Sequence, residues 1–313
     1  MRLIIFFCFF CLSFFCVSQN SHSKELSLLS DNDLYTSLYR DGYYTNGLFL
    51  TYRTVSNSDT KNLAKKIYSY QVGHMMYTSA KATIESANLH DRPFAGYFFG
   101  EFGISRFYNS NSIIITNLQI GVLGPNAKGQ ELQNFMHSIY NYPEAKGWKH
   151  QIHNAFALNL NSKFIKYLPK LSSSSIDISS YNSLKIGTIF TDISTGLYTR
   201  IGFKKLQELS NSVAFNSNLN TIGQNFSESF VFVKPMLNYI FYDATIQGSF
   251  LNETSPVTYK VNPITFSLEL GYLYSHKRIS FGYTFIFHTK KLKSVKVPNS
   301  NTYGSIYFGY YFN

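Results

Sequence analysis

Large apolar residues alternate with small or polar ones along several stretches of the chain, and this alternation most limits how the chain can fold. One face of residues 280–287 is wholly aromatic: Phe281, Tyr283, Phe285 and Phe287. Residues 305–312 and 48–53 alternate in the same way. A period of two with one apolar and one mixed face is typical of a lipid-facing barrel wall. A soluble β-sandwich has the same period, but its outer face carries more charge, whereas charged residues make up only 14% of this chain.

Residues 1–18 have the pattern of a secretory signal peptide. Arg2 gives a positive start, an apolar run follows, and Cys16-Val17-Ser18 fits a small-x-small cleavage site. Lipid attachment at Cys16 is an alternative, but Phe15 is bulky where a small residue is wanted. The segment contains all three cysteines, so cleavage would leave a single domain, residues 19–313, without a disulfide or a cysteine metal site.

Charge and hydropathy favour a membrane protein of a Gram-negative bacterium. The whole chain carries a net charge of +11, to which the leader contributes only Arg2. A basic surface suits nucleic acid, phospholipid or the phosphates of lipopolysaccharide. An exported chain rarely meets nucleic acid, so membrane lipid is the favoured partner. A basic, solvated surface without a specific partner is the alternative. No segment after the leader approaches the twenty apolar residues of a membrane-spanning helix. Export, aromatic strands and a penultimate aromatic, Phe312, predict an outer-membrane β-barrel.

The alternation marks thirteen candidate strands. They cover residues 24–31, 44–54, 69–77, 95–107, 112–124, 151–164, 176–188, 190–203, 227–242, 244–251, 262–275, 278–289 and 302–312. Bacterial single-chain barrels have an even number of strands, so merging one pair predicts an all-β, twelve-stranded antiparallel barrel. Residues 55–68 and 204–226 are predicted to be loops.

Polar residues gather around the first predicted hairpin. Asp-Asn-Asp occupies 31–33, and Asp-Gly-Tyr-Tyr-Thr-Asn-Gly occupies 41–47. Carboxylate, amide and hydroxyl oxygens in one place could hold a hard cation such as Ca²⁺. Asn, Asp and Gly also dominate ordinary turns, and spacing alone favours that interpretation.

Asp91 and Arg92 precede another predicted strand. They could form a structural ion pair near the membrane edge, or Arg92 could contact a lipid phosphate. The residues leave both interpretations open.

One segment, residues 126–143, has helical spacing. Its apolar residues recur at i, i+3, i+4, i+7 and i+8 and form one stripe: Leu132, Phe135, Met136, Ile139 and Tyr140. Asn126 is a candidate N-cap, and Pro143 marks the end. Gln133 and His137 lie one turn apart, between the buried and exposed faces. A partly shielded histidine there could act as a general base, but spacing alone favours a histidine hydrogen-bonded to a loop carbonyl.

Seven short motifs occur in order along nearly the whole mature chain. They are Asn-Asp-Leu-Tyr at 32–35, Tyr-Thr-Asn-Gly at 44–47, Asp-Arg-Pro-Phe-Ala-Gly at 91–96, Gly-Val-Leu-Gly-Pro at 121–125, Gln133-Asn134 to His137, Gly147-Trp148 before Gln151, and Asp-Ala-Thr-Ile-Gln-Gly at 243–248. Each motif alone is weak, but the ordered set resembles the LpxR family of outer-membrane lipid A 3′-O-deacylases.

The resemblance implies a transmembrane barrel with a short helix in an extracellular loop, and an active site near the outer rim between the wall and that helix. Enzymes of this family remove the 3′-linked acyloxyacyl group from lipid A and require Ca²⁺. The implied function is a lipopolysaccharide-modifying hydrolase that acts in the outer membrane as a monomer. The two other hypotheses are an outer-membrane phospholipase and a non-catalytic barrel that serves as a channel or surface-binding protein.

The same resemblance assigns roles to individual residues. His137 would be the base that activates water, and Asp33 would bind Ca²⁺, whose charge would stabilise the oxyanion. Asn32, Thr45 and Gln133 would position the site, and Glu144 is a candidate for a second metal ligand. Arg92 is the candidate substrate contact, on the separate ground given above that it could contact a lipid phosphate.

Overall fold

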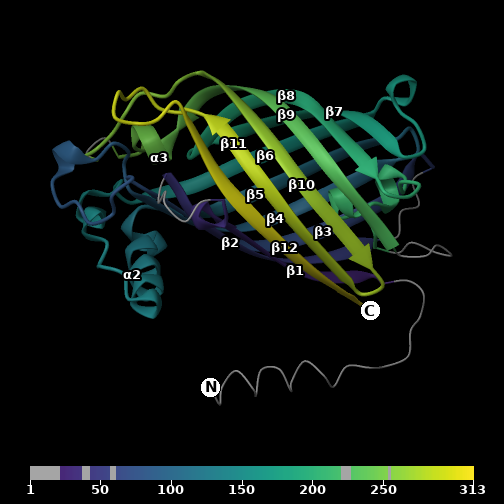
Figure 1. Cartoon of the computed structure of the whole chain (residues 1–313), viewed down its shortest axis with the longest axis horizontal. Helices are drawn as coiled ribbons and strands as arrows, with labels where there is room; N and C mark the ends of the chain where they lie inside the picture. The colour runs from purple at the N-terminus through teal and green to yellow at the C-terminus, as the bar shows by residue number, and fades with distance from the viewer. Residues whose placement is uncertain (1–21, 37–42, 57–60, 220–226, 253–254) are drawn as a thin grey trace, which may run out of the picture.

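The computed structural model describes residues 22–36, 43–56, 61–219, 227–252 and 255–313. Twelve antiparallel strands pair in chain order, and pairing of the first with the last closes the barrel (Figure 1). The strands are β1 Lys24–Asn32, β2 Tyr43–Ser56, β3 Leu63–Thr78, β4 Ala95–Tyr108, β5 Ser112–Leu123, β6 Ala155–Tyr167, β7 Ile176–Gly187, β8 Phe190–Gly202, β9 Ser227–Asp243, β10 Ile264–His276, β11 Ile279–Thr289 and β12 Ser300–Phe312. The predicted architecture is confirmed.

Two predicted segments differ most from the structure. Residues 244–251, predicted as a strand, form the short helix α3 (Ala244–Gln247) and a turn. The side chain of Asp243 starts this helix, because its carboxylate accepts a hydrogen bond from the backbone N–H of Thr245 at 2.9 Å. The loop predicted over 55–68 is shorter, since β2 ends at Ser56 and β3 begins at Leu63. The predicted signal peptide lies outside the described residues.

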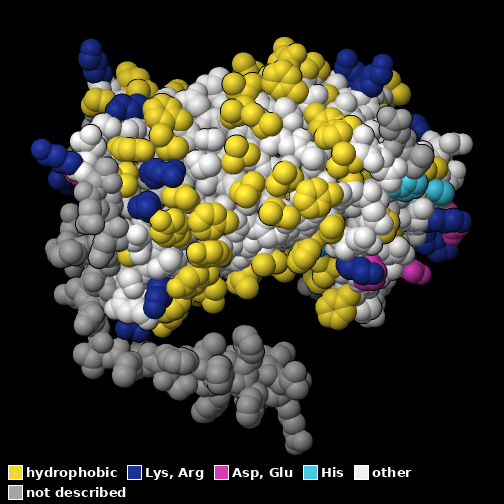
Figure 2. Space-filling view, turned by 180° about the vertical axis from the view of Figure 1, so that it is seen from behind, with side chains coloured by type: hydrophobic (Ala, Val, Ile, Leu, Met, Phe, Trp, Pro, Cys, Tyr) yellow, Lys and Arg dark blue, Asp and Glu magenta, His cyan; other side chains and the backbone are white. Residues whose placement is uncertain are grey.

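The outer face of the barrel is apolar. Leu50, Phe281 and Phe308 on three different strands are 50%, 42% and 45% exposed, whereas Thr51 and Ser280, which adjoin the first two, are buried. Figure 2 shows apolar side chains spread over the middle of the barrel, with Lys and Arg side chains toward both ends. This is the pattern of a wall that faces lipid.

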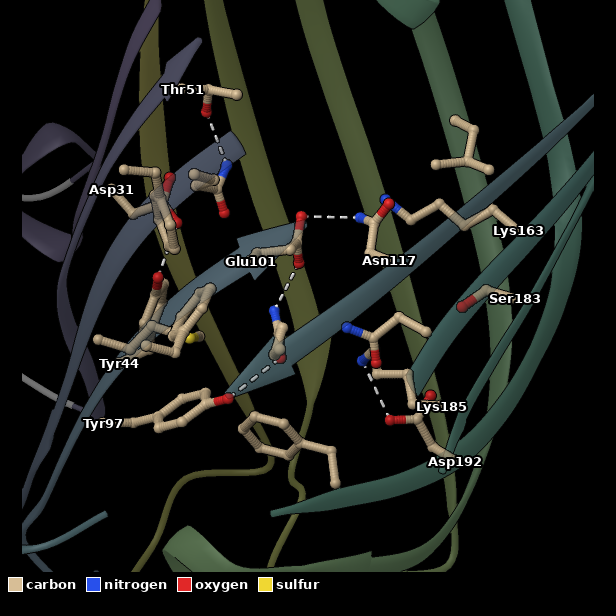
Figure 3. A pocket seen from close by; sticks show the side chains of 18 of the residues that line it. Asp31, Tyr44, Thr51, Tyr97, Glu101, Asn117, Lys163, Ser183, Lys185 and Asp192 are labelled. Carbon is tan, nitrogen blue, oxygen red and sulfur yellow. Dashed lines mark hydrogen bonds and ion pairs between the residues drawn. The ribbon is translucent and has the colours of Figure 1, made fainter. Parts of the chain in front are cut away.

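The inside of the barrel is polar. Ion pairs join neighbouring strands on this inner face, between Arg53 and Glu25 at 3.0 Å and between Lys234 and Glu269 at 2.7 Å. A cavity of about 490 Å³ lies among these strands. In Figure 3, Glu101 accepts hydrogen bonds from neighbouring amides in this cavity, one of them from Asn117 at 2.8 Å. A polar interior beneath an apolar wall is expected of a membrane barrel.

We call the barrel end that contains Lys24 and Phe312 the terminal end, and the opposite end the loop end. The segment after β8 folds into the terminal end. It includes the short helices η6 (Leu209–Asn211) and η7 (Val213–Phe215). Its apolar side chains pack in one cluster with inward-facing residues of seven strands: Ile67, Phe107, Ile113, Ile165, Tyr198, Phe230, Phe232 and Tyr311. Contact with so many strands places this segment inside the barrel, where it acts as a plug.

The remaining helices lie mainly at the loop end. Helix α2 (Gly129–Tyr140) follows β5 and projects beside the barrel (Figure 1). The short helices are η1 Asp33–Tyr35, η2 Ala87–Leu89, η3 Pro125–Ala127, η4 Lys146–His150 and, at the terminal end, η5 Pro169–Leu171. No helix in the described ranges is long and apolar enough to cross a membrane.

Candidate active site at the loop end

Asn32 shapes the chain where β1 ends. Its side-chain oxygen accepts a hydrogen bond from the backbone N–H of Leu34 at 2.8 Å and so caps η1. This turn brings Asp33 into a buried position, where it is only 2% exposed. Asn32 therefore positions the neighbouring carboxylate.

Thr45 occupies a β-bulge next to this turn. The pairing of β2 with β3 shifts register between Tyr44 and Asn46, so Thr45 is the extra residue. A bulge re-aims a side chain, and the Thr45 hydroxyl lies 2.6 Å from the hydroxyl of Thr78. Asn46 is the pairing partner of Asn32. The structure thus brings Asn32, Asp33 and Thr45 together at the rim of β1 and β2.

Helix α2 ends where predicted but begins differently. It ends at Tyr140, before Pro143, with Asn141 as its left-handed C-cap. Asn126 does not cap it, because that residue lies in η3 and Lys128 precedes the first helical residue. The predicted N-cap was wrong.

The orientation of α2 differs from the one its apolar stripe predicted. Gln133 is only 3% exposed, whereas Phe135 and Ile139 are 61% and 56% exposed. Leu132 packs against a buried cluster from three other segments: Met76, Ala82, Phe94, Ala145 and Trp148. The polar edge of α2 therefore faces the protein, and much of its apolar stripe faces outward.

Gln133 is held by Trp148, a member of this cluster. Its side-chain oxygen accepts a hydrogen bond from the indole N–H of Trp148. Its Nε2 is buried without a hydrogen-bond partner among the described residues. A buried amide donor of this kind is available to a substrate oxygen or a water molecule.

His137 lies one turn further along the same face and is half-buried. Its Nδ1 lies 2.6 Å from the carbonyl oxygen of Pro143. A carbonyl can only accept, so Nδ1 carries the proton and donates it, and the neutral ring keeps its lone pair on Nε2. The ring of Tyr142 packs against the imidazole edge to face, with centroids 5.8 Å apart. The carbonyl contact that spacing favoured is present, and it fixes the tautomer that a base requires.

Glu144 is exposed and lies beyond the C-terminus of α2. Its carboxylate accepts a hydrogen bond from the Asn134 side chain at 3.2 Å, and the oxygen of that side chain accepts one from the backbone N–H of Ala145 at 3.1 Å. Within the described ranges, no group of three or more His, Cys, Asp or Glu is arranged to hold a metal ion. The structure therefore does not gather Glu144 and Asp33 into such a cluster.

Arg92 lies inside the mouth of the barrel. It is 4% exposed, donates a hydrogen bond to the Thr245 hydroxyl at 2.9 Å and stacks over the Tyr77 ring at 4.2 Å. Burial lowers the pKa of its guanidinium, and the charge of Asp243 opposes this shift. Asp91 instead accepts hydrogen bonds from Tyr43 and Ser79. This position does not support the predicted contact of Arg92 with a lipid phosphate at the surface.

The sequence did not identify the residues that join α2 to the rim. Met76 packs with Trp148 beneath α2 and pairs with Asn46 across β2 and β3. The backbone N–H of Gly147 also donates to the carbonyl of Ala82 at 2.9 Å. Trp148, the only tryptophan in the sequence, stands in the motif Gly147-Trp148 before Gln151, and that motif was the signal available for it.

The close fit of α2 against Trp148 gives a first prediction. A Cβ on Gly129 would lie 2.4 Å from the buried Trp148 ring, so Gly129→Ala is expected to displace α2 at a cost of about 1–3 kcal/mol. Tryptophan fluorescence of the variant should shift to longer wavelength and become more accessible to acrylamide. Gly100→Ala is the control, because its Cβ would meet nothing within 4 Å. Unchanged fluorescence in Gly129→Ala would contradict the described packing.

Comparison with known proteins fits this architecture. The family model described as outer membrane protein LpxR matches residues 3–312. The structure of LpxR from Salmonella typhimurium aligns with a TM-score of 0.72 at 18% identity, and the alignment covers 92% of this chain and 100% of that one. The translocator domain of the autotransporter NalP from Neisseria meningitidis gives a TM-score of 0.43 at 8% identity, with coverage of 93% and 89%. No curated protein matches the chain. Because the family model spans nearly the whole sequence, the chain belongs to the LpxR family of outer-membrane proteins.

Proposed function

We propose that the protein is a Ca²⁺-dependent hydrolase that removes the 3′-linked acyloxyacyl group from lipid A. In this reaction His137 takes a proton from water as the water attacks the ester carbonyl. Negative charge then develops on the carbonyl oxygen and must be stabilised. When the oxyanion collapses, the bond between the carbonyl carbon and the sugar oxygen breaks, and the sugar oxygen takes the proton held by His137 to become a hydroxyl. The acyl group is released as a carboxylic acid.

The observation that carries this proposal is the orientation of His137. The Pro143 carbonyl holds the proton on Nδ1, which leaves Nε2 as the basic nitrogen. The imidazole is half-buried and shares a helix face with the buried amide of Gln133. A base with a fixed tautomer beside an available hydrogen-bond donor can orient water for attack on an ester.

The donor atoms at the β1–β2 rim fit Ca²⁺ chemically. Asp33 supplies a buried carboxylate, and Asn32 and Thr45 add an amide and a hydroxyl within the same turn and bulge. Hard cations prefer such oxygen ligands. We propose that Asp33 holds the ion and that Asn32 and Thr45 position it, with Glu144 as a weaker second candidate. When bound, Ca²⁺ would supply positive charge for the oxyanion.

The surroundings of α2 suit a lipid substrate. Phe135 and Ile139 face outward from the helix beside an apolar barrel wall. A lipid in the same membrane leaflet could place its acyl chains against these side chains without leaving the membrane. We propose that the loop end faces the cell exterior, where lipid A resides in a Gram-negative outer membrane.

The channel hypothesis has less support. Leu209, Val213, Phe215 and Leu219 pack against the inner wall and fill the terminal end of the described barrel with apolar side chains. A water-filled pore requires a polar passage from end to end. The plug therefore favours a barrel that serves as a scaffold for the rim.

The substrate class can be tested by offering the purified protein lipid A and a diacyl glycerophospholipid with Ca²⁺ in the same micelles. We expect mass spectrometry to show lipid A that has lost the 3′ acyloxyacyl group, while the glycerophospholipid stays intact. Release of fatty acid mainly from the glycerophospholipid would favour the phospholipase hypothesis. Failure to cleave either lipid would favour a non-catalytic barrel.

A further inference from the structure

The loop between β11 and β12 is rich in lysine and firmly anchored. Residues 290–297 read Lys-Lys-Leu-Lys-Ser-Val-Lys-Val, with no acidic residue. The Asn262 side chain donates hydrogen bonds to the carbonyls of Lys290 at 2.9 Å and Leu292 at 3.2 Å. Leu292 is 3% exposed and packs in a buried cluster with Ile246. These contacts fix the backbone from which the lysines project.

A groove of about 800 Å³ lies on the outer surface below this loop. The side of the groove formed by strands β9 and β10 is apolar, since Leu237, Ile264 and Phe266 line it and are 55%, 66% and 39% exposed. Lys290 and Lys293 line the side formed by the β11–β12 loop, and no carboxylate is among the described lining residues. The groove therefore places two positive charges directly above an apolar surface.

Both lysines have charge available for a ligand. The ion pairs found among the described residues do not include Lys290 or Lys293. Lys296 instead donates a hydrogen bond to the carbonyl of Asn88 at 2.6 Å and ties the loop to its neighbour. Val295, at the tip of the loop, is fully exposed and apolar. An exposed valine between lysines suits the boundary between lipid chains and headgroups.

The groove is separate from the candidate active site. It lies over β9, β10 and β11, whereas α2 packs beside β4. In the barrel order, β12, β1, β2 and β3 stand between β11 and β4. Figure 1 shows the β11–β12 loop in yellow above the barrel and α2 below it. A ligand in the groove would therefore not occupy the site at His137.

We propose that this groove binds one anionic membrane lipid through its phosphate. Lys290 and Lys293 would contact the phosphate, and Leu237, Ile264 and Phe266 would contact the first part of an acyl chain. A membrane lipid fits better than a soluble anion because the apolar half of the groove continues into the lipid-facing wall. This proposal does not depend on the proposed catalytic function.

The test compares lipid retention by the purified full-length barrel and by the double variant K290Q/K293Q. Native mass spectrometry would count bound phosphatidylglycerol and, in a parallel titration, phosphatidylcholine with the same acyl chains. Two lysines near an anionic headgroup predict that the variant binds phosphatidylglycerol about 10- to 30-fold more weakly, with phosphatidylcholine retention unchanged. Inorganic phosphate alone should not compete at concentrations equal to those of the lipid.

The matched control is K204Q/K205Q, which removes two exposed neighbouring lysines at the terminal end. It should retain phosphatidylglycerol as the unchanged protein does, and heat-dependent gel mobility would verify that both variants are folded barrels. Equal losses in the two variants, or no loss in K290Q/K293Q, would overturn the proposed lipid site. Competition by inorganic phosphate at lipid concentrations would also overturn it, because the groove would then recognise the anion without acyl chains.

Discussion

Alanine at position 137 is expected to slow release of the 3′ acyl group from lipid A by about 10²- to 10⁴-fold. The substitution removes the nitrogen that would accept the proton from water. It should leave the fold intact, because His137 is half-buried and its side-chain hydrogen bond reaches only the carbonyl of Pro143 in the adjacent loop. The rate would be measured from time courses of lipid A mass spectra with purified protein and Ca²⁺.

The control for this experiment is His276→Ala, which removes an exposed histidine from the terminal end of β10. That variant should keep the unmodified rate. Fluorescence of Trp148 would show that α2 remains docked in both variants, because this buried indole lies beneath the helix. A docked His137→Ala variant with full activity would contradict the assignment of the base.

The barrel could be predicted from the sequence because its two determinants are local. Alternation assigns each residue to a face, and the even strand number of bacterial barrels corrected thirteen candidates to twelve. The surplus candidate, residues 244–251, combined apolar character with a helix-start signal. Asp243 caps α3 through Thr245, and that capping signal outweighed a weak strand pattern.

The plug could not be predicted in the same way. Leu209, Val213, Phe215 and Leu219 all stand at odd positions, but the polar residues Asn211 and Ser217 interrupt that face, so no regular apolar period runs through the segment. Their burial depends on inner-wall residues from strands far away in the sequence, such as Ile67 of β3 and Tyr311 of β12. Only the closed barrel brings these side chains together, so the sequence of this segment alone predicts a loop.

The orientation of α2 shows why a membrane changes the interpretation of an apolar stripe. In water, such a stripe faces the protein core. Beside a lipid-facing wall, it can face lipid instead. Phe135 and Ile139 are exposed, and the buried contact is made by Leu132 and Gln133. Periodicity therefore located the edge that carries His137, but it could not say which neighbour that edge meets.

The partners of Thr45 were also beyond the sequence. A bulge is a property of strand pairing, and the shift between β2 and β3 depends on the register of two separate strands. The hydroxyl of Thr78 becomes a neighbour of Thr45 only through this pairing. Local turn composition predicted polar groups at the rim but not which of them meet.

Asparagine at position 33 is expected to lower the rate of lipid A deacylation by about 10²- to 10³-fold, similar to the loss of one oxyanion stabiliser. Asp33 is buried, and Asn32 caps the turn that presents it. The substitution keeps the size of the side chain but removes the negative charge proposed to bind Ca²⁺. Half-maximal activity should therefore require a higher Ca²⁺ concentration, and a chelator should abolish the activity of the unmodified protein.

Two further variants separate a metal ligand from a general effect of lost charge. Glu131→Gln changes an exposed carboxylate of α2 that pairs with Lys128, and it should leave the Ca²⁺ requirement unchanged. Glu144→Gln tests the second candidate ligand: a raised Ca²⁺ requirement would add Glu144 to the site, and an unchanged one would assign it to the loop held by Asn134. If Asp33→Asn keeps both its rate and its Ca²⁺ dependence while remaining folded, the ion is not held by this carboxylate.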